Sequence, residues 1–83
     1  MSVYLYYHCD AWKRFDSMSL QGVYSTGING RDKLAAQIKN DCLKGEIDLG
    51  NQDKVMDLIM SQNIEMVNDL MDYGYIACEE VEE

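Results

Sequence analysis

The chain of 83 residues contains no proline and one histidine, and its uninterrupted apolar runs are only a few residues long. A membrane-spanning helix needs about 20 apolar residues, and a secretory signal needs a basic leader before an apolar block, so we expect neither. The cysteines at positions 9, 42 and 78 form no CxxC pair, and their odd number is typical of free thiols in a reducing compartment. We therefore expect a cytoplasmic protein without disulfides.

The residue spacings of catalytic and metal sites are also missing. His8, Cys9 and Asp10 are neighbours on a predicted strand, where successive side chains point to opposite faces, so only His8 and Asp10 could share a site. The scattered histidine and cysteines lack the paired spacing of a zinc site, and Asp48 and Asp53 lack the ligand spacing of a calcium loop. We expect no catalytic residue, no metal and no cofactor, and hence a protein that is not an enzyme.

The length and composition are those of one compact α+β domain. Hydrophobic residues make up 47% of the chain and charged residues 27%, which is typical of a foldable sequence. We expect a single domain over residues 1–83, in which residues 79–83 form a flexible acidic tail. No second domain fits in this length.

Hydrophobic periodicity predicts the order of the elements. Alternation predicts strands over residues 3–12 and 18–25, and Leu20, Gly22 and Tyr24 should lie on one side of the second strand. A helix should begin at a cap formed by Asn29 and end at Gly45. Helical spacing continues over residues 52–72, where two helices broken near residues 61–63 are favoured over one long helix, and residues 75–81 resemble a last strand.

The predicted order is therefore ββααβ or ββαααβ. Its economical packing is a small three-stranded antiparallel or mixed sheet with two or three helices packed on one face. In the first strand, Leu5 and Tyr7 should face these helices, which would leave Tyr4 and Tyr6 on the opposite face.

Aromatic residues close to basic ones could stack on unpaired bases, as RNA-binding sheets do. One hypothesis for the function is thus a small single-stranded nucleic-acid binder. The candidate aromatic face consists of Tyr4, Tyr6, Trp12, Lys13 and Arg14.

Charge is distributed very unevenly along the chain. Residues 1–45 carry six basic and four acidic groups, a sum of +2, whereas residues 46–83 carry Lys54 against eleven acids, a sum of −10. An acidic face of this kind repels nucleic acid and attracts basic partners, although it could also serve only to keep a small protein soluble. The candidate partner-binding carboxylates are Asp53, Asp57, Glu65, Asp69, Asp72, Glu79, Glu80, Glu82 and Glu83.

In size, acidity and lack of catalytic motif, the chain resembles small phage-encoded inhibitors of host defence or host DNA enzymes, such as anti-CRISPR proteins and DNA mimics. The resemblance implies a protein-binding module in the host cytoplasm that inhibits a nucleic-acid-handling partner by presenting carboxylates to its basic surface. It implies no direct contact with nucleic acid or membrane. A third hypothesis is a homo-oligomer, such as a homodimer, whose subunits pair at strand edges.

Overall fold

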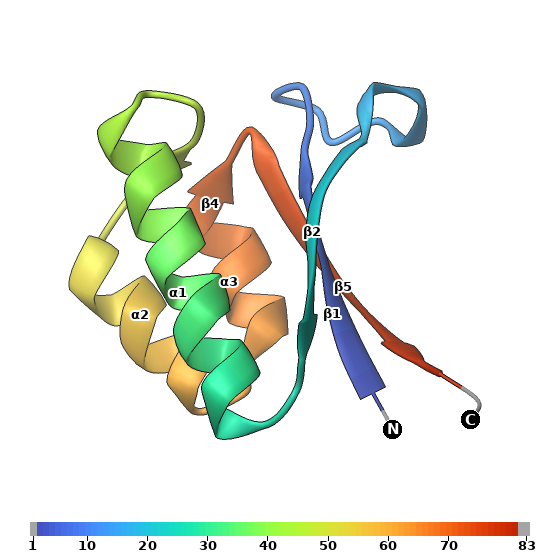
Figure 1. Cartoon of the computed structure of the whole chain (residues 1–83). Helices are drawn as coiled ribbons and strands as arrows, with labels where there is room; N and C mark the ends of the chain where they lie inside the picture. The colour runs from blue at the N-terminus through green and yellow to red at the C-terminus, as the bar shows by residue number, and fades with distance from the viewer. Residues whose placement is uncertain (1, 82–83) are drawn as a thin grey trace.

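Residues 2–81 are described by the computed structural model, and they form a three-stranded antiparallel sheet with three helices on one face (Figure 1). Strand β1 (Ser2–His8) is central and pairs with both β2 (Ser19–Ser25) and β5 (Gly74–Glu80). The predicted α+β architecture is therefore confirmed. Glu79 and Glu80 belong to β5 and not to a tail, because they continue its pairing with β1.

The three helices are α1 (Ile28–Leu43), α2 (Gln52–Met60) and α3 (Ile64–Leu70). The predicted break at residues 61–63 is confirmed, and the side chain of Asn51 caps α2 by accepting from the Lys54 amide at 3.1 Å. The predicted cap at Asn29 is wrong, since α1 already begins after Gly27 and has no side-chain cap. At its other end, Gly45 adopts a φ of +79° and ends the helix as predicted.

Two short strands were missed by the periodicity. Strand β3 (Asp48–Leu49) pairs with β4 (Met71–Asp72), and this ladder joins the link after α1 to the end of α3. A single-turn 3-10 helix, η1 (Phe15–Ser17), also lies between β1 and β2. Elements of two or three residues are too short to show a period, so no pattern could have predicted them.

The core lies between the sheet and the helices. The face of β1 that packs against the helices is the opposite of the one expected from the sequence. Tyr4 and Tyr6 are 3% and 0% exposed, whereas Leu5 and Tyr7 are only partly buried on the other face. The expectation for β1 was therefore wrong. The physical reason is that a buried tyrosine combines a large apolar ring with a hydroxyl that can reach a polar partner, and Tyr6 finds one in α1.

The pairing of β1 with β2 contains an irregularity that reverses the expected position of Leu20. Tyr6 pairs with Gly22, but the next residue, Tyr7, pairs with Leu20, so Gln21 is the extra residue of a bulge. Paired residues share a face, so Leu20 lies with Tyr7 on the face away from the helices, where it is 53% exposed.

Candidate functional site

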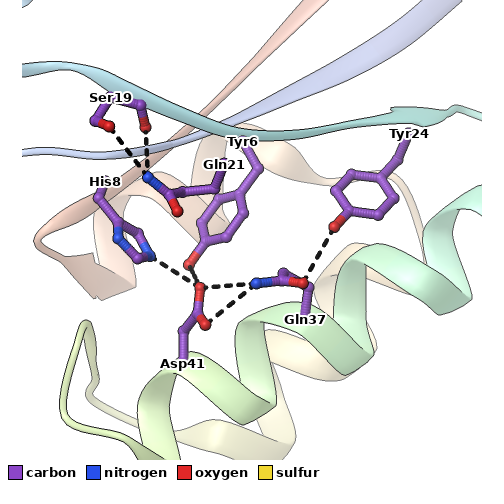
Figure 2. A network of polar contacts seen from close by, with 7 residues as sticks. All are labelled: Tyr6, His8, Ser19, Gln21, Tyr24, Gln37 and Asp41. Atoms are coloured by element: carbon purple, nitrogen blue, oxygen red, sulfur yellow. Dashed lines mark hydrogen bonds and ion pairs between the residues drawn. The ribbon is translucent and has the colours of Figure 1, made fainter.

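A buried polar cluster joins α1 to the sheet (Figure 2). Its centre is Asp41, a carboxylate 4% exposed on the core-facing side of α1. The Tyr6 hydroxyl donates to this carboxylate at 2.7 Å, and His8 Nε2 lies 2.9 Å from it. The amide of Gln37 donates to the same group at 3.2 Å. Three side chains from two elements therefore satisfy one buried anion.

These contacts decide the charge state of the cluster. Burial alone would raise the pKa of Asp41, but the hydrogen bonds from Tyr6, His8 and Gln37 outweigh it and hold that pKa below its usual value. Burial, followed by the hydrogen bond to Asp41, raises the pKa of Tyr6 well above its ordinary range. Asp41 is therefore ionised and Tyr6 is neutral and donating at physiological pH.

The cluster extends from Asp41 toward β2. Gln37 accepts from the Tyr24 hydroxyl at 3.5 Å, and the Tyr6 and His8 rings form an edge contact with centroids 5.5 Å apart. Figure 2 also shows Ser19 and Gln21 beside His8, joined to each other by hydrogen bonds. In the part of the chain that is described, Asp41 is the only side-chain hydrogen-bond partner of His8.

The arrangement is therefore suited to fastening α1 to the sheet, and the sequence reasoning missed its key residue. The sequence pattern pairs His8 with Asp10, but Asp10 instead accepts from the Arg14 side chain at 2.7 Å in the following loop. A signal did exist: Asp41 continues the buried series Leu34 and Ile38 at helical spacing. A carboxylate at such a position must find buried donors or be destabilising.

The cysteines do not form a site. Cys9, Cys42 and Cys78 are all free, and burial raises the pKa of Cys9, which makes its thiol less reactive. Among residues 2–81, no group of three or more histidine, cysteine, aspartate or glutamate residues could hold a metal ion.

The second notable surface is the face of the sheet that no helix covers, here called the open face. The strand pairing assigns to it alternate residues of all three strands, and Val23 is 55% exposed there. The strand residues of the open face are Val3, Leu5, Tyr7, Leu20, Val23, Ser25, Tyr75, Ala77 and Glu79.

A groove of about 610 Å³ lies over part of the open face. Tyr7, Tyr75 and Ala77 line it from the strands, and the loop between β1 and β2 contributes Phe15 and Met18. Phe15 is 95% exposed, which is unusual for a large apolar side chain. Lys13 and Glu79 are the only charged residues of the groove lining.

The candidate carboxylates lie on several elements. Those on the helical side are all exposed: Asp53 and Asp57 on α2, Glu65 and Asp69 on α3, and Asp72 on β4. Glu79 lies on the open face, separate from them, and Glu80 follows it in β5. Glu82 and Glu83 lie outside the described residues.

Five of these carboxylates have no cationic partner among the described residues. Within residues 2–81, the set on α2, α3 and β4 takes part in no salt bridge. Asp72 even pairs directly with Asp48 across the β3–β4 ladder, which places two exposed carboxylates opposite each other.

The candidate aromatic face is not one surface. Tyr4 and Tyr6 are buried under the helices, so they are inaccessible to a base. Trp12 is 78% exposed in the loop after β1, with the Arg14 guanidinium 5.5 Å from its ring centroid. Lys13 donates to the backbone carbonyl of Asn68 in α3.

No family model matches the chain, and searches of curated proteins and of solved structures find no similar protein. None of the helices over residues 2–81 has the length and apolar character needed to cross a membrane.

Proposed function

We propose that the protein is a non-enzymatic, cytoplasmic protein-binding module that presents its helical carboxylates to the basic surface of a nucleic-acid-handling protein. The observation that carries this proposal is the set of five exposed carboxylates on α2, α3 and β4 that form no salt bridge within residues 2–81. The proposed mode of action is that of small phage-encoded inhibitors of the anti-CRISPR or DNA-mimic type.

Local stability does not account for these charges. Glu65 and Asp69 are four residues apart on α3, and like charges at this spacing destabilise a helix. Asp48 and Asp72 are directly opposed across a ladder of two residues, which is also unfavourable. A partner that supplies lysine and arginine side chains would relieve both repulsions, and complementary charges would also steer its approach.

The burial of Tyr4 and Tyr6 weighs against the alternative of a single-stranded nucleic-acid binder. Stacking requires an accessible ring face, and phosphate binding requires clustered cations, whereas the chain carries a formal charge of −8.

The test is an affinity capture from bacterial lysate with two charge variants. The first variant carries Glu65→Lys, Asp69→Lys and Asp72→Lys. The matched control carries Asp16→Lys, Asp32→Lys and Glu46→Lys, which change the net charge equally at exposed positions elsewhere. We expect wild type and control to retain the same basic nucleic-acid-binding proteins, quantified by mass spectrometry, and the first variant to lose them.

Binding should also weaken steeply between about 50 mM and about 500 mM salt, since exposed charges are screened. Capture that is equal for both variants, or that salt does not weaken, would contradict the proposal.

A further inference from the structure

The open face lies on the opposite side of the sheet from the acidic helices (Figure 1). Its strand residues are apolar except for Glu79 and the small Ser25, which pairs with Val3. Apolar sheet faces are normally covered, and exposed apolar patches mark surfaces for association. The occupant of this face must therefore be apolar, and its charges must match those at the ends of the groove.

These charges are opposite and lie at opposite ends. Glu79 pairs with Val3, near the start of β1. Lys13 follows the other end of β1, donates to the backbone carbonyl of Asn68 and lines the groove together with Tyr7 and Tyr75, which pair with each other. Tyr75 and Glu79 are four residues apart on β5, about 13 Å along an extended strand. The groove therefore has a cationic and an anionic end.

A surface with this polarity is complementary to itself. A two-fold axis that lies in the interface, parallel to the sheet, perpendicular to its strands and close to Ala77 would place Lys13 of each copy over Glu79 of the other. The same rotation would bring the exposed Phe15 of each copy toward the start of β1 in the other, where Val3 lies half-buried on the open face. We propose that the open face is the interface of a homodimer, in which the sheets of two copies of this chain pack face to face.

The charges of the molecule favour a second copy of this chain, and not the basic partner proposed above, as the protein that covers the open face. A basic partner would be attracted to the five helical carboxylates and not to a face with one charge of each sign. The chain's net charge of −8 opposes self-association through the helices, but face-to-face packing of the sheets turns both helical layers outward. The dimer does not depend on the proposed function, and it would carry two acidic surfaces on opposite sides.

The size of the face limits the strength of the dimer. Three strands of seven residues span roughly 23 by 14 Å, a footprint of about 330 Å², to which the loop with Phe15 adds. Stable interfaces bury about 800 Å² on each partner. We therefore expect a weak dimer with a dissociation constant on the order of 10 to 100 μM.

Sedimentation equilibrium from about 1 μM to about 1 mM tests this proposal. The mass should rise from 9.5 kDa toward twice that value. Phe15→Ala, at a position 95% exposed and so safe for folding, should weaken association about tenfold. Lys13→Glu and Glu79→Lys should each weaken it by a similar factor, because each substitution changes two symmetry-related pairs.

The double variant Lys13→Glu with Glu79→Lys distinguishes the arrangement from all others. It restores both opposite-charge pairs between two copies, so its dissociation constant should return to within about threefold of wild type. Thermal melts of each variant separate association from any loss of the Lys13 contact with Asn68.

A mass that stays at 9.5 kDa up to about 1 mM would overturn the proposal. A dimer that Phe15→Ala leaves unchanged would do the same and would indicate pairing at the edges of β2 or β5. Failure of the double variant to recover association would show that Lys13 and Glu79 do not pair between two copies, which would overturn the proposed arrangement.

Discussion

The two faces of strand β1 are built from alternating residues of similar bulk, but only one is covered. Tyr4 and Tyr6 lie under the helices, whereas Leu5 and Tyr7 lie on the open face. The difference is that Tyr6 finds a buried acceptor in Asp41, so its hydroxyl loses no hydrogen bond on burial. Alternation separates a strand into two faces, but the partners available on the helices decide which face enters the core.

Substitution of Tyr6 should have the largest effect on stability. Tyr6→Ala removes a completely buried ring and should lower the free energy of unfolding by about 3 to 5 kcal/mol. Tyr6→Phe keeps the ring but leaves Asp41 with one donor fewer, which should cost about 1.5 to 3 kcal/mol. Urea unfolding followed by circular dichroism measures both losses. A Tyr6→Phe variant as stable as wild type would mean that the hydroxyl contributes nothing, and equal losses for the two variants would mean that burial of the ring contributes nothing.

Asp41→Asn should be the next most destabilising change, by about 2 to 3 kcal/mol, because it removes a buried anion that three side chains surround. Asp32→Asn is a suitable control, since Asp32 is exposed on the same helix. It should change the free energy of unfolding by less than about 0.5 kcal/mol. Similar unfolding midpoints for the two variants would show that the cluster around Asp41 does not stabilise the packing of α1 against the sheet.

The pH dependence of the same pair of proteins tests the charge on Asp41. A carboxyl whose pKa is lowered in the folded state stabilises the protein above its unfolded pKa of about 3.9, and this contribution is lost as the pH falls through the folded value. The stability difference between wild type and Asp41→Asn should therefore be constant near neutrality and shrink below about pH 4. A stability difference that grows as the pH falls would mean that folding raises the pKa of Asp41 and does not lower it.

Much of the fold could be predicted from the sequence because its long elements have clear periods and punctuation. The three strands of the main sheet, the break between α2 and α3 and the stop at Gly45 all follow from local patterns. The face of β1 and the side on which Leu20 lies could not, since the first depends on a hydroxyl finding Asp41 and the second on a bulge at Gln21.

The candidate sites divide in the same way. The exposure of the helical carboxylates could be predicted, because they fall between the apolar positions of α2 and α3. The cluster of Tyr6, His8 and Asp41 could not, because Asp41 is more than thirty residues from the other two along the chain, and only packing brings it to them. The groove depends equally on the loop that places Phe15 and Met18 beside the open face.

Leu5→Ala should have a much smaller effect than Tyr6→Ala, which is the reverse of the order expected from the sequence. Leu5 is partly buried on the open face, so its truncation should cost roughly 1 kcal/mol in dilute solution, where the proposed dimer is dissociated. Chemical unfolding at about 1 μM protein measures this cost. A loss as large as that of Tyr6→Ala would mean that the open face is covered within the monomer.

The smallest expected effect, and the only favourable one, concerns the acidic side of the molecule. Asp72 faces Asp48 across the β3–β4 ladder, and both side chains are exposed. Asp72→Lys converts this repulsion into an attraction and should stabilise the fold by a few tenths of a kcal/mol, while Asp72→Asn should give about half of that gain. The gain should vanish at about 1 M salt, where the Debye length is about 3 Å. A melting temperature lowered by Asp72→Lys would show instead that this carboxylate is needed for the fold, and Asp72 could then no longer be counted among the charges available to a partner.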